Sequence, residues 1–356
     1  MPLVYGCKEK FLPEVKEVNV SYLVVEGLIN TGADSTIFNI SRTFKLNNKA
    51  VVAPEKAALV QVENEGGTTY VLPETIKSGK YGRPSLNLDP AKKYRLRIRT
   101  KDNKEYLSDF VESKTAQPFD LKYIITNNAL NIYISTLDPA GKSIYYRHSY
   151  EETWQYESPI KSFYKFENGK LVSRNFPEDD ITNCWHFLPS SNISLSSTAN
   201  LTEDRLTDKL IVSIPSNSEK VKVGYSILIK QSALTKDAFE FWEILRNNTE
   251  NVGSIFDPQP SQFLSNIRST TNAAEIVIGF VSSGSTTQKR FIIKVADLPT
   301  AWFNYSPDED CNNSRKGLSE FKGVPFIPIT VTNGTDLLYC VDCRLRGGTT
   351  QKPSFW

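Results

Sequence analysis

The first third of the chain consists of short segments in which apolar and polar residues alternate. In residues 93–99, Tyr94, Leu96 and Ile98 alternate with basic residues, and this period of two predicts a half-buried β-strand. Similar runs predict strands at 22–29, 36–43, 57–63, 68–72 and 106–111, with a glycine turn joining the third and fourth. Six or seven short strands over about 95 residues favour an immunoglobulin-like β-sandwich formed by residues 21–117.

The remainder, residues 118–356, predicts a second and larger β-rich domain. Its apolar runs predict strands at 121–126, 130–136, 144–150, 209–214 and 220–230. One segment differs, because Ala238 and Trp242 recur with helical spacing and Thr235 can cap a helix start. The expected fold class is therefore mainly β, with one helix near residues 235–247.

Composition narrows the class of protein. The 356 residues are 39% hydrophobic and 23% charged, as in globular chains long enough for two domains. Sixteen Tyr, 19 Phe and 5 Trp fit a β-rich protein, because aromatic rings pack well on pleated sheets. With 42 basic and 40 acidic side chains the net charge is +2, which argues against nucleic acid as a partner. No apolar run is long enough to predict a membrane-spanning helix.

The N-terminal residues carry the pattern of a lipoprotein signal. An apolar pair, then Gly6 and Cys7, form a lipobox, in which signal peptidase requires the small residue and the cysteine thiol accepts a diacylglycerol. No charged region and long apolar region precede it, so residues 1–6 are interpreted as a trimmed signal peptide or a late start. Residues 1–20 are then the signal remnant and a charged tether. The alternative is an ordinary exposed cysteine.

The other four cysteines indicate an oxidising compartment. Without Cys7 the chain has an even number of cysteines, which allows three sets of disulfide pairings: Cys184, Cys311, Cys340 and Cys343. The last two lie in a segment predicted to be extended, where residues three apart point to opposite faces about 10 Å apart, too far for a disulfide. We therefore expect both to bond to the first two. A four-cysteine zinc site and a redox-active pair are the alternatives.

Residues with catalytic chemistry form no convincing motif. The chain has two histidines, His148 and His186, which are interpreted as structural. The adjacent carboxylates at 151–152 and 179–180 face apart in an extended chain and fit solvated loops better than a glycosidase pair. Ser283-Gly-Ser285 lacks the glycine pattern of a nucleophile elbow. We expect no enzyme activity, no metal and no cofactor.

An aromatic-rich stretch between residues 145 and 187 is the candidate contact region. Planar rings give a large contact area with little loss of rotamer entropy. Aromatic and charged residues alternate here, as in an exposed loop or sheet edge. Four residues are the candidates for ligand or partner binding: Tyr150, Trp154, Tyr156 and Tyr164. The alternative is that these rings fill the core, as we expect for Trp185, Trp242 and Trp356.

Several stretches in sequence order resemble the DUF4249 lipoproteins of Bacteroidota, a family of unknown function. They include Leu23-Val-Val-Glu-Gly27, Ala238-Phe-Glu-Phe-Trp242, Ser254-Ile-Phe-Asp-Pro-Gln-Pro-Ser261 and the ending Cys340-Val-Asp-Cys343 through Trp356. The resemblance implies an exported lipoprotein with an immunoglobulin-like first domain and a larger β-rich second domain. Such proteins are often encoded beside TonB-dependent outer-membrane transporters.

Together these observations predict a lipid-anchored envelope binding protein. We expect it to serve a TonB-dependent outer-membrane transporter in ligand capture or as a lid. Its partners would be that transporter and the bilayer, reached through acylated Cys7, and its location the outer membrane, on either face. The alternative is a structural envelope protein that organises partners and has no small-molecule ligand. A hydrolase is a third alternative.

Overall fold

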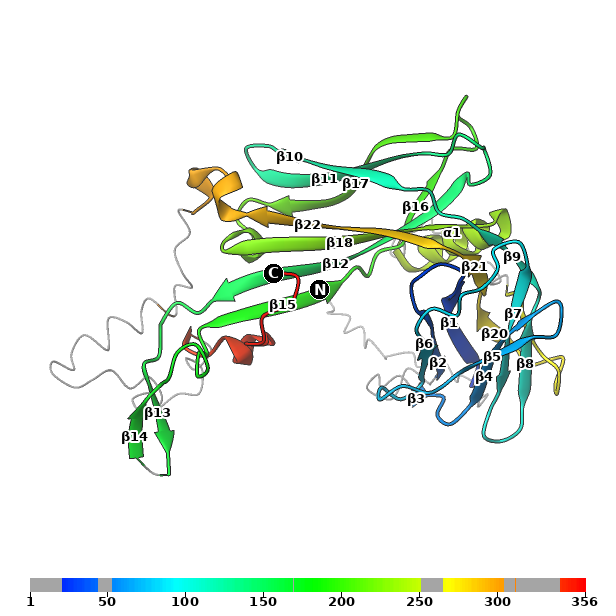
Figure 1. Ribbon diagram of the computed structural model, residues 1–356, viewed down its shortest axis with the longest axis horizontal. Helices are drawn as coiled ribbons and strands as arrows, with labels where there is room; N and C mark the ends of the chain where they lie inside the picture. Colours follow the sequence, from blue (N-terminus) through cyan, green and yellow to red (C-terminus); the bar gives the residue numbers. More distant parts are fainter. Residues whose placement is uncertain (1–20, 44–52, 169, 251–264, 304–310, 312–339) are drawn as a thin grey trace, which may run out of the picture.

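The computed structural model describes residues 21–43, 53–168, 170–250, 265–303, 311 and 340–356. Its described elements are mostly β-strands, which confirms the mainly β fold class. Figure 1 shows two bodies, one formed around the N-terminal strands and the other around the long central strands. The tether predicted for residues 1–20, including Cys7, lies outside the described residues.

The first body is a 12-stranded sheet folded around one core, with the path β19-β8-β7-β9-β21-β1-β2-β3. The alternation predicted for β7 is confirmed, because Tyr94, Leu96 and Ile98 are each at most 1% exposed. The predicted hairpin is also present as β4 and β5, with Gly67 at a φ of 85° that favours glycine. Its N-terminal strands are β1 (Leu23–Asn30), β2 (Thr36–Arg42), β3 (Ala53–Pro54), β4 (Leu59–Asn64), β5 (Thr69–Leu72), β6 (Lys80–Arg83), β7 (Lys93–Arg99), β8 (Glu105–Ser108) and β9 (Val111–Lys114).

The first body also contains strands from far along the chain. β19 (Ile267–Ser269) pairs with β8, and β20 (Val277–Gly279) lies parallel to β1. β21 (Ser282–Gly284) pairs with both β1 and β9. The division predicted at residues 117 and 118 therefore needs correction, because residues 267–284 complete the first sheet. Parallel pairing over such a separation leaves no local pattern in the sequence.

The second body packs two sheets against each other around a second core. Figure 1 shows the two layers, with β10, β11 and β17 above the longer strands. The three-stranded sheet has β10 (Phe119–Ile125), β11 (Ala129–Leu137) and β17 (Arg205–Pro215). The five-stranded sheet has β12 (Tyr145–Glu157), β15 (Asn183–Pro189), β16 (Ser194–Ser197), β18 (Gly224–Ala233) and β22 (Thr286–Lys294).

The helix α1 (Lys236–Glu250) confirms the predicted helix. The Thr235 hydroxyl accepts a hydrogen bond from the Ala238 backbone N–H at 3.3 Å, so the predicted cap is also confirmed. The helix runs past the predicted end, and its buried residues are Ala238 and Phe241, whereas Trp242 is half-buried. Among the described residues, no helix is long and apolar enough to cross a membrane.

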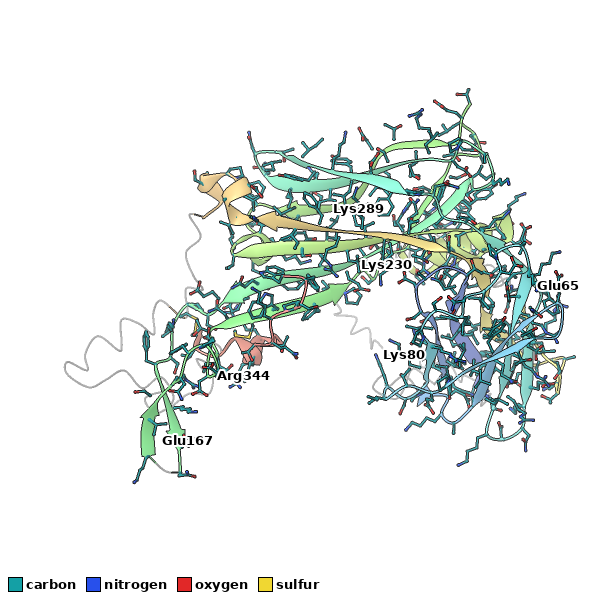
Figure 2. The ribbon with its side chains drawn as sticks, viewed as in Figure 1. Glu65, Lys80, Glu167, Lys230, Lys289 and Arg344 are labelled. Carbon is teal, nitrogen blue, oxygen red and sulfur yellow. A yellow bond between two sulfur atoms is a disulfide. The ribbon has the colours of Figure 1, made fainter. Side chains whose placement is uncertain are left out.

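Smaller elements complete the second body. A hairpin of β13 (Tyr164–Glu167) and β14 (Lys170–Ser173) projects from it, with Glu167 at its end (Figures 1 and 2). The strand predicted for 220–230 begins later, at β18, because a 3₁₀ turn precedes it. The 3₁₀ helices are η1 (Glu219–Val221), η2 (Val295–Asp297), η3 (Thr300–Phe303) and η5 (Cys343–Arg346).

Gly284→Val is expected to destabilise the first body by about 1–3 kcal/mol or more, because the backbone must move to admit the side chain. A Cβ at Gly284 would collide with the Lys114 carbonyl oxygen, where β21 pairs with β9. Gly66→Ala is the control, because its Cβ would meet only the Asn64 side chain, at 3.4 Å. Urea unfolding measures both changes, and equal effects would contradict the expectation.

Candidate functional site

The four described cysteines form two disulfides, one of which joins the C-terminal segment to strand β15 of the second body. Cys184 bonds to Cys343 and Cys311 bonds to Cys340. These bonds confirm that the last two cysteines pair with the first two and not with each other, and the zinc alternative does not hold. The local structure differs from the predicted extended segment, because Cys343 begins the 3₁₀ helix η5.

After Cys343, the C-terminal residues pack against the edge strand β15. Thr349 and Trp185 exchange two backbone hydrogen bonds, of 2.8 and 3.0 Å. Trp356 packs edge-on against Trp185 with ring centroids 6.5 Å apart, and Arg290 lies 3.5 Å from the Phe355 ring centroid. The packing roles expected for Trp185 and Trp356 are thus confirmed, and the tail covers part of an otherwise open sheet edge.

Tyr150, Trp154 and Tyr156 lie on the central strand β12, which contradicts their predicted exposure, whereas Tyr164 begins β13. β12 pairs with β15 and β16 on one side and with β18 on the other. Trp154 is 8% exposed in the core between the sheets, and its Nε1 donates to Glu219 at 3.1 Å. Tyr150 packs against the same core, Tyr156 is half-buried, and the Tyr164 side chain lies outside the described ones. Tyr150, Trp154 and Tyr156 are therefore packing residues.

Charged residues near these rings made the stretch look exposed. Glu152 is only 3% exposed and accepts hydrogen bonds from Lys220 at 2.5 Å and from the Tyr225 hydroxyl at 2.9 Å. Burial, together with this carboxylate, raises the pKa of Tyr225. Glu151 faces the other way, as predicted, and pairs with Lys230 at 2.5 Å. The prediction that Glu152 lies in a solvated loop is therefore wrong. Its counter-ion, Lys220, comes from another segment of the chain, so the sequence around Glu152 does not reveal it.

Both histidines are packed within the second body. His148 is 1% exposed, and its Nε2 lies 3.1 Å from the Ser196 hydroxyl. Burial, with a smaller effect of Lys209, lowers the pKa of His148 to about 3. His186 stacks on Trp154 with centroids 5.1 Å apart, and burial lowers its pKa as well. Within the described ranges, no group of three or more His, Cys, Asp or Glu side chains could hold a metal ion.

His148→Gln is expected to reduce the loss of stability on acidification. The pKa of His148 falls from 6.5 to about 3 on folding, so the unfolded state binds a proton that the folded state excludes. The free energy of unfolding should therefore decrease as the pH falls from about 6.5 toward 3, by up to about 1.4 kcal/mol per pH unit. Urea unfolding across this range should show a shallower slope for the variant, and an unchanged slope would count against this role.

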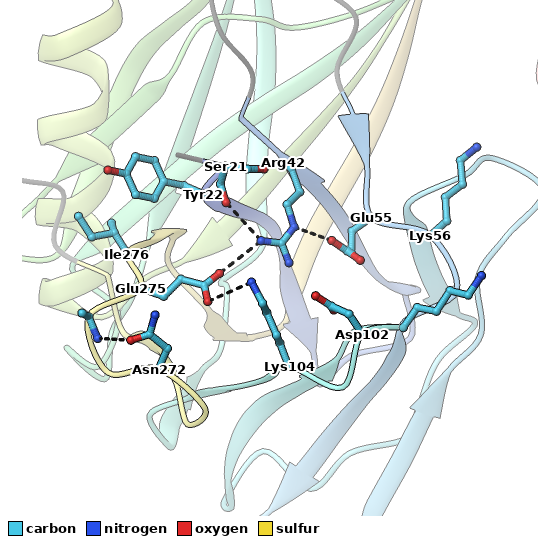
Figure 3. Close-up of a pocket in the computed structure, with 12 residues that line it drawn as sticks. Ser21, Tyr22, Arg42, Glu55, Lys56, Asp102, Lys104, Asn272, Glu275 and Ile276 are labelled. Atoms are coloured by element: carbon cyan, nitrogen blue, oxygen red, sulfur yellow. Dashed lines mark hydrogen bonds and ion pairs between the residues drawn. The ribbon is translucent and has the colours of Figure 1, made fainter. Parts of the chain in front are cut away.

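A wide hollow on the first body is the candidate binding site (Figure 3). It has a volume of about 1030 Å³ and lies between the start of the described chain, the end of β2, the β7–β8 turn and the loop before β20. Four basic and three acidic side chains line it: Arg42, Lys56, Lys101, Lys104, Glu55, Asp102 and Glu275. The hollow is therefore lined by charges of both signs.

Arg42 is fixed at the centre of this hollow by carboxylates from two distant segments. Its Nε donates to Glu55 at 2.7 Å and its Nη1 to Glu275 at 3.3 Å, while the Tyr106 hydroxyl donates to Glu275 at 2.6 Å (Figure 3 shows the two Arg42 contacts). Burial lowers the pKa of Arg42, but hydrogen bonds to Glu55 and Tyr106 outweigh burial and raise it above its usual value. Burial and the bond to Glu275 raise the pKa of Tyr106 to about 12. These side chains form the floor of the hollow and hold one another in place by hydrogen bonds.

The rim of the hollow retains free charge. Lys56 and Lys101 make no ion pair with any described residue, whereas Lys104 lies 3.6 Å from Glu275. Ile276, also at the rim, is 55% exposed. The arrangement suits binding of a polar ligand or a partner surface with negative charge, because ammonium groups on flexible stems can adapt to it.

Sequence reasoning missed this site because its parts are far apart along the chain. Arg42 and Glu275 are 233 positions apart, and they meet because β20 lies parallel to β1. Neither residue belongs to a recognisable motif. The strand pattern around Tyr106 was visible in the sequence, but the contact of its hydroxyl with Glu275 was not.

Comparisons with known proteins give a family and a fold likeness. A family model described as a domain of unknown function, DUF4249, matches residues 8–290. A comparison with curated proteins finds no match. Among solved structures, the chain is similar to a segment of two fibronectin type-III domains from chicken tenascin, with 12% identity and a TM-score of 0.18. That match covers 60% of this chain and 92% of the tenascin segment.

Proposed function

We propose that this chain, which belongs to the DUF4249 family, is a binding protein of the bacterial envelope, without enzyme activity and anchored to the outer membrane by a lipid on Cys7. It serves a TonB-dependent outer-membrane transporter, either by capturing ligand or by covering the transporter. The cysteine pattern is the observation that carries the proposal.

Four of the five cysteines are used in disulfides, and Cys7 is left over. Disulfides of this kind persist in oxidising compartments outside the cytoplasm, which supports export of the chain. The remaining cysteine follows Gly6 in a lipobox-like context, which supports its use as the acylated residue. A diacyl anchor gives stable membrane attachment, whereas one chain would be marginal.

The charged hollow supports binding over a purely structural role. Its floor is held by the ion pairs of Arg42, while Lys56 and Lys101 at the rim remain free for a ligand or partner. A protein that only organised other proteins would not require such a preformed polar recess.

Purification from detergent-solubilised outer membranes tests the proposal. The native lipoprotein should retain an outer-membrane transporter identified by mass spectrometry, and the double variant Lys56→Glu, Lys101→Glu should retain less of it. Lys289→Glu is the matched control, because this exposed lysine lies on the second body, away from the hollow (Figure 2). Absence of any transporter from the native preparation would contradict the proposed partnership, and full retention by the double variant would exclude the hollow as the contact.

A further inference from the structure

Arg147 is a half-buried cation on the outer face of the five-stranded sheet, and it forms no ion pair with a residue of that sheet. It lies on the central strand β12, and the residues directly across from it are Leu195 on β16 and Ser232 on β18. Its neighbours on the same face of β12 are Tyr145 and Ser149, because side chains two apart share a face. None of these side chains is acidic.

The guanidinium is held by an aromatic ring instead. Its central carbon lies 3.7 Å from the ring centroid of Trp242, which projects from α1. Such stacking takes up one face of the planar group and leaves the N–H donors at its edge available. Arg147 makes no hydrogen bond or ion pair with any described residue, yet it keeps part of its surface exposed.

Among the described side chains, no carboxylate close to Arg147 balances its positive charge. Burial lowers the pKa of Arg147 to about 10, so that the side chain remains charged at neutral pH. Glu26 on β1 acts in the opposite direction, but it does so through space, without a hydrogen bond. Arg42 and Arg95, which are also partly buried, each contact a carboxylate at 2.7–2.8 Å. Withdrawing a charged side chain from water without a counter-ion costs free energy, and a bound anion would offset this cost.

We propose that Arg147, clamped by Trp242, binds an oxyanion group of a ligand, either a carboxylate or a phosphate. The fork of N–H donors at the guanidinium edge matches two oxygens of such a group, and the Trp242 ring keeps the fork in place. Ser232 lies directly across from Arg147 on the same face of the sheet, and its hydroxyl lies 3.1 Å from the Thr286 hydroxyl. The site involves α1 and the five-stranded sheet and is separate from the hollow around Arg42, so it does not depend on the lipid anchor.

Calorimetric titration with sodium phosphate and with sodium acetate, at ionic strength held constant with sodium chloride, tests this site. The wild-type protein should bind at least one probe saturably in the millimolar range, and the preferred probe identifies the oxyanion. Arg147→Met should weaken that binding by about tenfold or more, because charge-assisted hydrogen bonds are lost. Arg147→Lys should weaken it too, because lysine keeps the charge but loses the fork.

Arg246→Met is the matched control, because this arginine lies on the same helix and is already paired with Glu243. Its affinity should equal that of the wild type. Circular dichroism establishes that each variant is folded, and Arg147→Lys keeps the test usable if Arg147→Met does not fold. The proposal is overturned if the wild type binds neither probe saturably, if folded Arg147 variants bind as well as the wild type, or if Arg246→Met loses affinity equally.

Discussion

Replacing Cys184 and Cys343 by serine together is expected to lower the free energy of unfolding by about 3–5 kcal/mol. The two residues are 159 positions apart, so the bond restricts a long loop of the unfolded chain. In the folded protein the same bond holds η5 against β15, where Thr349 covers the strand edge. Loss of the bond should therefore also release the C-terminal tail. Unfolding in urea under non-reducing conditions measures the energy, and limited proteolysis reports the tail.

The second disulfide provides the comparison for this prediction. Cys311 and Cys340 are only 29 positions apart, and in the chain-entropy model a shorter loop gives a smaller effect, by about 1–2 kcal/mol. The pair Cys311→Ser, Cys340→Ser should accordingly destabilise the protein less and should leave the contact between Thr349 and Trp185 protected. If both pairs had the same effect, loop closure would not be the source of the stabilisation.

Trp154→Ala is expected to destabilise the second body by about 3–5 kcal/mol, because it opens a large cavity in the core. Trp154 fills the space between the two sheets, stacks on His186 and donates a hydrogen bond to Glu219. The substitution removes all three contacts. Thermal and urea unfolding measure the loss. Unfolding of the domain is the result that separates a packing residue from the exposed contact residue that the sequence indicated.

Phe187→Ala is the control for this substitution. Phe187 lies on the neighbouring strand β15 and is 55% exposed, so its truncation should change the free energy of unfolding by about 0.5 kcal/mol or less. A stable Trp154→Ala variant, comparable to Phe187→Ala, would show that the ring contributes little to the core.

The sequence predicted the elements whose structure depends on local pattern. The alternation of Tyr94, Leu96 and Ile98 predicted strand β7 and its inward face, and Thr235 predicted the start of α1. The pairing of Cys340 and Cys343 with the two distant cysteines was also predicted, although η5 is not the extended segment that the argument assumed. For β7 and α1 the information lies within a few residues, whereas the cysteine pairing was predicted from an extended geometry that Cys343 does not adopt.

Features that depend on contacts between distant segments were missed. The return of β20 to pair with β1 carries no local signal, and it brings Glu275 to Arg42. Trp154 was misjudged for a related reason, since nearby Glu152 suggested solvent although Lys220 and Tyr225 satisfy it inside the fold. Alternation with charged residues indicates exposure only where no partner from another segment approaches.

The chemical state of Cys7 tests the central claim most directly. A host that processes lipoproteins should express the chain behind a complete lipoprotein signal sequence, as wild type, as Cys7→Ser and as the neighbouring control Lys8→Ser. The account predicts that wild type and Lys8→Ser stay in the outer-membrane fraction under high salt, with a diacylglycerol-modified Cys7 in the N-terminal peptide by mass spectrometry, and that Cys7→Ser is released. An unmodified Cys7 peptide in the wild type, or a Cys7→Ser protein that remains bound to the membrane, would contradict it.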